Sequence, residues 1–354
     1  AGAFSYDAGR ALECLPSLAA TDIELPDIAV GIYHQALIRC RQTQQTWLLA
    51  PQTQIAELTQ YWLAPHTPMS SSFGLLSNWH SNMSQTEYTA KFERIQDYLR
   101  AGDCYQINLA QRFSADYTGN TWSAYQRLRT SNRAPFSGFL QLESGALLSL
   151  SPERFLSISA AGHVQTKPIK GTKPRSADAR EDAALAEALA QSPKDRAENV
   201  MIVDLLRNDL SRLCEPGTVK VPTLFAIESY PAVHHLVSTV TGSLRDAKLG
   251  IELLGLAFPG GSITGAPKIR AMEIIEELEP HRRSFYCGSF GYFSQHGAAD
   301  TNIAIRTLVA AAGRIHCWAG GGIVADSEAS SEYQETLDKV AKILPVLAQS
   351  EVEV

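Results

Sequence analysis

A lysine in the segment TKPIKGTKPR, residues 166–175, has a local sequence that separates it from its neighbours. Lys170 stands between Pro-Ile and Gly-Thr in a stretch typical of a buried strand, whereas three other cations flank that stretch. A neutral lysine amine is a nucleophile, and burial or nearby positive charge lowers the pKa that otherwise keeps it protonated. Considered alone, a lysine usually faces water. The sequence therefore leaves three roles open for Lys170: a surface charge, a phosphate ligand or a nucleophile.

Carboxylates recur at helical spacing in two separate segments. In PKDRAENVMIVDLLRNDL, Asp195 and Glu198 are three residues apart. Glu332, Glu335 and Lys339 form a similar polar stripe on the last helical segment. Residues at this spacing project from one face of a helix, and carboxylates on two helices suit a hard, oxygen-preferring cation such as Mg²⁺. From the spacing alone, two solvated helix faces are the more common explanation.

Two glycine-rich turns are further candidates for contact with a ligand. FPGGSITGAPK, which begins at residue 258, joins a turn to a helix that opens near Pro267, where free N–H groups can receive an anion. Its spacing does not match a Walker A phosphate loop. WAGGGIVADS, residues 318–327, places three glycines directly after a strand, which permits close approach of a ligand or of another backbone segment. Ordinary tight turns explain either segment by itself.

The composition limits the classes of function. The chain has 354 residues, 45% hydrophobic and 19% charged, with a net charge of −6, which indicates a globular protein and argues against a general nucleic-acid binder. No apolar run approaches the roughly 18 residues of a membrane span. Six scattered cysteines lack zinc-ligand spacing and favour reduced thiols in the cytoplasm. The chain starts without an initiator Met or a signal peptide, and we expect an N-terminal segment to be missing.

A linker and a helix start are predicted early in the chain. Residues 62–84 are rich in Pro, Ser and Asn, which is typical of a linker. Ser84 and Glu87 fit a capping box, and Gly102 can close the helix that follows. The pattern therefore predicts that an ordered helix begins directly after the linker.

The remaining elements occur in groups. Residues 136–172 have the pattern of consecutive strands and residues 182–213 that of helices, and a second group of strands precedes the last helix. Strands grouped apart from helices indicate an α+β protein with antiparallel sheets. We expect residues 1–83 to be the remainder of an N-terminal region plus the linker, and residues 84–354 to form one catalytic unit.

Taken together, short segments carry a resemblance that none of them carries alone. In chain order they are SPERF, PIKGT, DRAEN, DLLRNDL, VHHLVS, FPGGSITGAPK, IRT, AGGGIV and EYQET, which span residues 151–336. The chain resembles the chorismate-utilising enzymes, a family that includes anthranilate synthase, isochorismate synthase and aminodeoxychorismate synthase. The resemblance covers nearly the whole chain, and it implies an α+β fold of two large antiparallel sheets packed together with helices outside.

The resemblance also implies roles for individual residues. The residues that would hold Mg²⁺ are Glu198 and Glu335, supported by Asp195 and Glu332. The residues with catalytic roles would be Lys170, Glu153 as general acid/base, His235 and Ser262. The groups that bind the substrate carboxylates would be Tyr292, Arg306, Lys339 and the amides of Gly320, Gly321 and Gly322. Without the family, His235 is typical of a core histidine and Ser262 of a turn residue.

Two positions separate the branches of this family. PIKGT carries Lys170 where anthranilate synthases usually have alanine, and in this it resembles the aminodeoxychorismate synthases. The isochorismate-forming branch has a water-activating lysine at the position of Gln106, and that base is absent here. The resemblance therefore implies ammonia as the nucleophile. We expect a separate glutamine amidotransferase subunit to supply it, because no such module occurs in this sequence.

The implied reaction converts chorismate and ammonia into 4-amino-4-deoxychorismate, for p-aminobenzoate and folate biosynthesis, through a covalent Lys170 intermediate. One alternative is an anthranilate synthase component, which aminates C2 and eliminates pyruvate; Lys170 argues against it. The other is a non-catalytic chorismate-binding subunit, which the intact acidic pairs and Glu153 argue against. We expect neither nucleic acid nor membrane as a partner.

Overall fold

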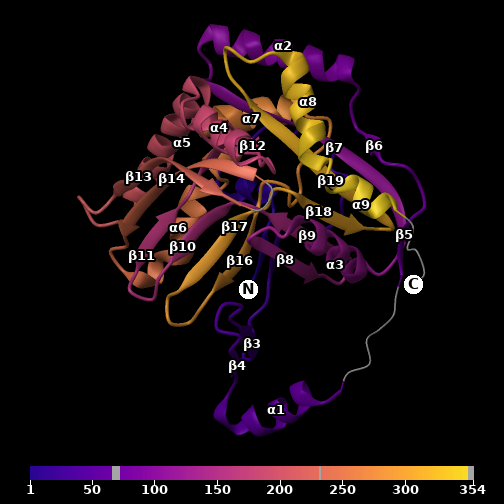
Figure 1. Cartoon of the computed structure of the whole chain (residues 1–354), viewed down its shortest axis with the longest axis vertical. Coiled ribbons are helices and arrows are strands. Elements are labelled where there is room, and N and C mark those ends of the chain that lie inside the picture. The colour runs from indigo at the N-terminus through magenta and orange to yellow at the C-terminus, as the bar shows by residue number, and fades with distance from the viewer. Residues whose placement is uncertain (66–71, 231–232, 350–354) are drawn as a thin grey trace.

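The computed structural model of the chain describes residues 1–65, 72–230 and 233–349. In this part the chain forms two large antiparallel sheets (Figure 1). The first runs in the order β12 (Ile169–Pro174), β14 (Val233–Ser243), β11 (His163–Thr166), β10 (Arg154–Ile158), β17 (Ala299–Ile303), β16 (Ser289–Phe293), β1 (Gly2–Phe4) and β2 (Ile28–Val30), with β13 (Lys220–Ser229) also paired to β14. The second runs in the order β15 (Gly265–Ala266), β7 (Gln106–Gly119), β19 (Arg314–Ile323), β18 (Thr307–Ala311), β9 (Gly145–Ser151) and β8 (Phe136–Gln141). The predicted α+β fold with two large antiparallel sheets is confirmed.

Helices pack against both sheets. Against β12 and β14 of the first sheet pack α4 (Ala179–Ala190) and α5 (Pro193–Ser211). Against β9, β7 and β19 of the second pack α3 (Thr121–Asn132), α7 (Lys268–Leu278) and α8 (Ala329–Val340), respectively. Further out, α6 (Gly250–Ala257) contacts α5, α2 (Gln85–Ala101) contacts α8, and α9 (Leu344–Ala348) contacts α3; the 3₁₀ helices are η1 (Tyr6–Ala11), η2 (Gln52–Gln54), η3 (Ala247–Leu249) and η4 (Gly261–Ile263). Among the helices described, none has the length and apolarity that crossing a membrane requires.

A shared apolar core joins the two sheets. Buried side chains of the first sheet, such as Phe155 and Val240, belong to the same cluster as Leu147, Val309 and Trp318 of the second. Burial of each large apolar side chain contributes about 1.5–3 kcal/mol, so this cluster holds the sheets in a defined relation. A second cluster joins the second sheet to α3 and α9, and a third joins β7 to α2 and α7. The strands that carry the predicted site residues are therefore positioned by rigid packing.

The ends of α2 follow from its local sequence. The Glu87 N–H donates a hydrogen bond to the Ser84 hydroxyl, and the Ser84 N–H donates one to the Glu87 carboxylate at 2.7 Å. The predicted capping box is confirmed. Gly102 ends the helix at a φ of 80°, a conformation that glycine adopts without strain, as predicted.

The prediction of a linker at residues 62–84 is wrong over the second half of that range. Residues 66–71 lie outside the described residues, but β5 (Phe73–Leu75) and β6 (His80–Ser81) pair with β7. Phe73 is buried and stacks on Tyr117 of β7, so one aromatic anchors a short edge strand that Pro, Ser and Asn content conceals. The division into residues 1–83 and 84–354 stays a prediction, although β1 and β2 from the first part belong to the first sheet.

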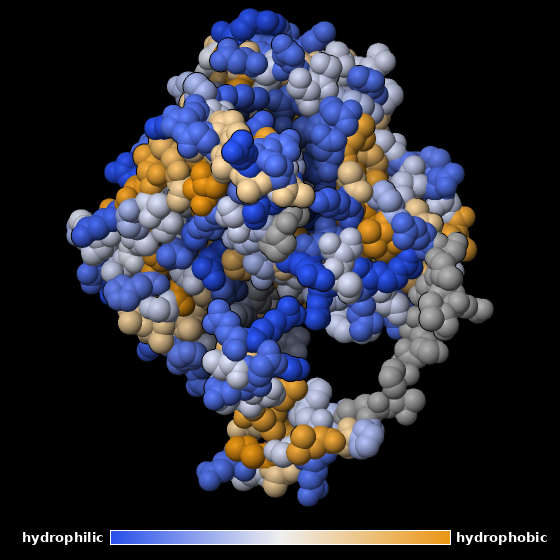
Figure 2. Space-filling view, viewed as in Figure 1, coloured by the Kyte–Doolittle hydropathy of each residue, from blue (hydrophilic) through white to orange (hydrophobic). Residues whose placement is uncertain are grey.

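One part of the chain stands away from the two sheets. It consists of the hairpin of β3 (Ala36–Arg39) and β4 (Thr46–Leu49) and of helix α1 (Ile55–Leu63), at the bottom of Figure 1. These elements expose apolar side chains, including Trp47 and Trp62, and Figure 2 shows orange surface there. None of the predicted site residues lies on them.

Candidate active site

Lys170 points inward from β12 and is shielded from water. Its side chain is 11% exposed, and Nζ donates a hydrogen bond to the main-chain oxygen of Ser262 at 3.4 Å. Nζ also lies 3.8 Å from a carboxylate oxygen of Glu198. Burial lowers the pKa of Lys170, although the Glu198 and Glu153 carboxylates oppose that change. Since burial penalises the charged form, the pKa of Lys170 moves in the direction that a nucleophilic amine requires. The low exposure of the side chain shows that the surface-charge interpretation of Lys170 is wrong.

An irregularity in β12 gives Lys170 this orientation. The pairing register of β12 with β14 shifts between Ile169 and Thr172, which is the mark of a bulge. Gly171 has a φ of 81°, in the left-handed region that favours glycine. A Cβ atom on Gly171 would lie 2.7 Å from Cγ of Asp195, so glycine is also needed for the approach of α5. The segment Lys-Gly-Thr thus combines a turned backbone with room for an acidic neighbour.

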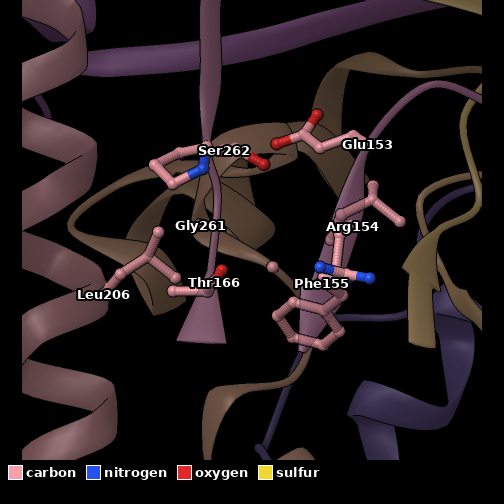
Figure 3. Close-up of a pocket in the computed structure, with 10 residues that line it drawn as sticks. Glu153, Arg154, Phe155, Thr166, Leu206, Gly261 and Ser262 are labelled. Carbon is pink, nitrogen blue, oxygen red and sulfur yellow. The ribbon is translucent and has the colours of Figure 1, made fainter. Parts of the chain in front are cut away.

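Glu153 lies almost fully buried in the connection between β9 and β10. Burial raises its pKa to about 7, against the opposing effects of a hydrogen bond with Ser262 and of the Lys170 charge. A carboxyl group with this pKa can donate or accept a proton at neutral pH. Figure 3 shows Glu153 and Ser262 at one end of a cavity of about 10 Å³, with Leu206 and Phe155 toward the other end. The structure thus brings Lys170, Glu153 and Ser262 together, while their catalytic roles stay predictions.

The glycine-rich turn before α7 carries Ser262 and is fixed to β7. After η4, Gly265 and Ala266 form β15, which pairs with β7. A Cβ atom on Gly265 would lie 2.0 Å from the main-chain oxygen of Gln106. It is the main-chain oxygen of Ser262, not an N–H group, that faces Lys170. Within the described residues, both side-chain polar atoms of the buried Gln106 lack a hydrogen-bond partner. An unpaired buried amide is unusual, and this one lies beside the turn that carries Ser262.

The two acidic helices face each other near β12 and β19 (Figure 1). Lys194 of α5 pairs with Glu332 of α8 at 3.3 Å, and Glu332 is buried. A Cβ atom on Gly321 would lie 2.9 Å from an oxygen of Glu332 and 3.4 Å from one of Glu335, so both carboxylates reach the main chain of β19. The hydrophilic surface between α4 and α8 is hollowed in Figure 2. For Glu332 the interpretation as a solvated helix face is wrong.

The acidic residues fit a hard cation by their chemistry, but lysines contact them. Among the residues that the structure describes, no three acidic, cysteine or histidine side chains converge as a ready-made metal site. Each glutamate instead has a lysine partner: Glu198 has Lys170, Glu332 has Lys194 and Glu335 has Lys339. Burial raises the pKa of Glu198, and the Asp195 and Glu332 charges add to this effect, although Lys170 and Lys194 oppose it. Carboxylates that repel one another in this way suit a divalent cation, and the Mg²⁺ site stays a prediction.

Arg306 carries a positive charge that no carboxylate in the described part of the chain neutralises. Burial lowers its pKa. Burial, followed by the nearby Arg306 charge, lowers the pKa of His235 to about 4, so His235 is neutral at neutral pH. Nδ1 of His235 lies 2.9 Å from the Thr172 hydroxyl on the neighbouring strand. A shielded cation without a partner is costly, and an anionic ligand would offset that cost.

Lys339 and the three glycines of β19 form another part of the site. Nζ of Lys339 donates to the Gly320 oxygen at 2.7 Å and lies 2.6 Å from Glu335. β18 pairs with β19 only as far as Cys317, whereas β7 continues past Gly322. In the described residues, one edge of β19 therefore has no paired strand over the glycines, and N–H groups on such an edge are available to a ligand.

Tyr292 is a predicted site residue whose relation to the others is not fixed by a hydrogen bond or ring contact in the described part of the chain. It lies half-exposed on β16, opposite Asp300. No hydrogen bond or ring contact among the described residues joins it to another predicted site residue. Its role in substrate binding stays a prediction.

Two residues beside the predicted site were missed from the sequence. Lys194 stands four residues before Glu198, so helical spacing alone places it on the same face of α5, and this signal was available. Thr172 faces His235 only because β12 and β14 pair in one particular register. No local pattern indicates that register.

Comparisons with known proteins extend the resemblance over the chain. A family model described as chorismate binding enzyme matches residues 1–345. The chain is 57% identical over 347 residues to "Aminodeoxychorismate synthase component 1" of Klebsiella aerogenes, covering 97% of this chain and 76% of that protein. It is 56% identical over 347 residues to the protein of the same description in Escherichia coli strain K12, covering 98% and 76%. The crystal structure of anthranilate synthase component I from Streptococcus pneumoniae TIGR4 aligns with a TM-score of 0.86 at 31% identity, covering 97% of this chain and 79% of the other.

Proposed function

The chain belongs to the chorismate binding enzyme family, and we propose that it converts chorismate and ammonia into 4-amino-4-deoxychorismate. One observation carries this proposal: the shielded amine of Lys170 contacts Ser262 and Glu198 and lies near Glu153. The identity of more than half of all aligned residues with proteins described as aminodeoxychorismate synthase component 1 supports it. The product would serve p-aminobenzoate and folate biosynthesis.

In the first step, the neutral amine of Lys170 attacks C2 of the chorismate ring. The two ring double bonds shift, the C4–O bond breaks, and the hydroxyl leaves as water with a proton from Glu153. The Lys170 nitrogen, now bonded to C2, loses a proton to the Glu153 carboxylate. The Ser262 side chain, which hydrogen-bonds Glu153, and its main-chain oxygen, which accepts from Lys170, hold the acid and the nucleophile in position.

In the second step, ammonia attacks C4 and forms the new C4–N bond. The double bonds shift back, the C2–N bond to Lys170 breaks, and one proton passes from the incoming nitrogen to the leaving amine. Chorismate and ammonia thus give 4-amino-4-deoxychorismate and water, and Lys170 is regenerated. Two displacements with allylic shifts explain why nitrogen replaces the hydroxyl at the same carbon.

Substrate binding is proposed to rest on positive charge around the glycines of β19. Chorismate is a dianion, and Arg306, Lys339 and the free edge of Gly320–Gly322 supply cations and N–H donors for its carboxylates. Glu198 and Glu335, supported by Asp195 and Glu332, are proposed to hold Mg²⁺. When bound, this ion would supply positive charge to a substrate carboxylate.

The source of ammonia is proposed to be a second protein. The relatives are described as component 1, which implies a partner component. We propose that this partner is a glutamine amidotransferase subunit. By resemblance, we align the neutral amide of Gln106 with the water-activating lysine of the isochorismate-forming branch. The absence of that lysine favours ammonia over water as the nucleophile. We propose that both chains act in the cytoplasm.

The reaction product decides between this proposal and its alternatives. The protein is incubated with chorismate, Mg²⁺ and an ammonium salt, and the product is identified by mass spectrometry. 4-Amino-4-deoxychorismate is expected. Anthranilate with pyruvate would contradict the proposal, and isochorismate would show that the inference from Gln106 is wrong.

A further inference from the structure

Next to the candidate active site, Arg283 and Glu279 form an ion pair whose side chains are 1% and 4% exposed. Nε of Arg283 donates to Glu279 at 2.9 Å, and Nη2 donates to the other carboxylate oxygen at 2.7 Å. A buried ion pair by itself is weak evidence of stabilisation, because the cost of removing two charges from water offsets their attraction. What else the two side chains contact therefore decides their role.

The remaining hydrogen-bonding groups of the pair join two segments that carry the site. Nη1 of Arg283 donates to the main-chain oxygen of Ile263 at 3.0 Å, and Nη2 donates to that of Asn108 at 2.6 Å. The N–H of Ala110 donates to Glu279 at 2.9 Å. The pair thus connects the turn of η4 to strand β7 through main-chain atoms of both segments.

Each of the two connected segments lies next to residues that take part in the proposed reaction. Ile263 directly follows Ser262, whose oxygen accepts from Lys170 and whose side chain hydrogen-bonds Glu153. On the other side, Asn108 and Ala110 pair with Gly322 and Gly320 of β19. The distance between the turn and β7 therefore sets the distance between the nucleophile and the edge where the substrate carboxylates are proposed to bind.

We propose that Arg283, held by Glu279, is a positioning residue that fixes the Ser262 turn against β7 and so places Lys170 and Glu153 relative to the substrate. The guanidinium is planar and presents its donors in a fixed fork, which an ammonium group cannot imitate. The rings of Tyr6 and Tyr286 lie 4.9 Å and 5.6 Å from it and restrict its movement further. The kinetic test of this inference rests on the proposed function. The fixing of the turn against β7 does not, and it can be tested whatever the reaction is.

The test compares Arg283→Lys with a matched control, Arg112→Lys. Arg112 is 3% exposed, makes two hydrogen bonds of 2.7 Å to Asp22 and lies over the Trp318 ring, but it contacts no predicted site residue. Hydrogen–deuterium exchange of the turn at residues 260–266 is expected to accelerate in Arg283→Lys and to stay at the wild-type rate in Arg112→Lys. Equal exchange of this turn in both variants would overturn the proposal, whatever reaction the protein catalyses.

The kinetic part separates positioning from a general loss of stability. In Arg283→Lys, kcat is expected to fall about 10- to 100-fold with little change in KM for chorismate, because a displacement of the order of 1 Å is costly to an oriented reaction. In Arg112→Lys, kcat is expected to stay near wild type even where Tm falls. Since Arg283 acts through the turn, the double variant Arg283→Lys with Ser262→Ala should show a smaller fold-loss of kcat than the product of the fold-losses in the two single variants. Multiplicative losses, or an unchanged kcat in Arg283→Lys, would overturn the proposal.

Two further measurements keep the test decisive. If Arg283→Lys does not fold, Glu279→Gln replaces it, because this change keeps the side-chain size and weakens the ion pair with Arg283. The product of the wild-type reaction is identified first. A product other than 4-amino-4-deoxychorismate refutes the proposed function, and kcat of the single and double variants is then measured for the product that forms.

Discussion

The amine of Lys170 and the carboxylate of Glu198 lie 3.8 Å apart, and burial favours the uncharged form of each group. At the surface, such a pair would remain fully charged, because water stabilises both ions. Here the penalty for burying charge acts on both partners and works against the attraction between them. The arrangement therefore lowers the pKa of Lys170 even though a carboxylate lies beside it, and this is the direction that a nucleophilic amine requires.

Replacement of Lys170 by alanine is expected to abolish C4 amination, with a loss in kcat of at least about 10³-fold, since the proposed covalent step then has no nucleophile. Mass spectrometry of the intact protein with chorismate should show an adduct in the wild type and none in the variant. Lys173→Ala is the matched control, because Lys173 lies exposed on the same strand. Full activity of Lys170→Ala would refute the nucleophile role.

Glu153 makes the stability of the protein depend on pH in a defined direction. Its pKa rises from 4.5 to about 7 on folding, so between these values the native state binds a proton that the unfolded chain releases. Stability from this group is fully present below pH 4.5 and is lost as pH rises through about 7, by about 3 kcal/mol. Glu153→Gln cannot titrate, so it lacks this loss. The free energy of unfolding of the variant should therefore increase relative to that of the wild type as pH rises over this range.

Urea unfolding of wild type and Glu153→Gln between pH 5 and pH 8 measures this difference. Glu143→Gln, in the exposed turn between β8 and β9, controls for the loss of a carboxylate. A difference between wild type and Glu153→Gln that does not change with pH would contradict the raised pKa.

The glutamates of α5 and α8 are expected to determine the affinity for Mg²⁺. Glu198→Gln and Glu335→Gln should each weaken Mg²⁺ binding at least about 10-fold, because each removes a charged oxygen ligand from the proposed site. Isothermal titration in the absence of ammonia measures the affinity without turnover, and chelation should abolish activity until Mg²⁺ is restored. Glu328→Gln, exposed just before α8, is the control. Equal affinity in all three variants would place the metal elsewhere.

Local features of the fold could be predicted from the sequence because their determinants lie within a few residues. The capping box of Ser84 and Glu87 and the left-handed Gly102 depend only on their own helix, and both are confirmed. Grouped strands likewise indicated the antiparallel sheets. The edge strand at Phe73 was concealed, because its one buried aromatic stacks on Tyr117, which is far away in the sequence.

The candidate site could be predicted as a set of residues but not as a geometry. Thr172 meets His235 only in one register of β12 and β14, and a shift of one residue would turn Thr172 to the other face. Arg283 and Glu279 show helical spacing in the sequence, yet nothing local indicates that both are buried and bonded to main-chain atoms of β7 and η4. Such relations depend on tertiary packing, which a pattern of neighbours does not contain.

Arg306 is expected to act on the substrate and not on the stability of the free protein. Its guanidinium has no carboxylate partner among the described residues, so Arg306→Ala should leave Tm close to wild type while raising KM for chorismate about 100-fold, the cost of one charged hydrogen bond. The same change removes a positive charge near His235. The pKa of His235 should therefore rise above about 4, while burial keeps it below its ordinary value, and NMR titration of the imidazole measures this. The control for the loss of an arginine is Arg314→Ala, because Arg314 lies exposed beside Asp116. A marked loss of Tm with an unchanged KM would show instead that Arg306 stabilises the fold.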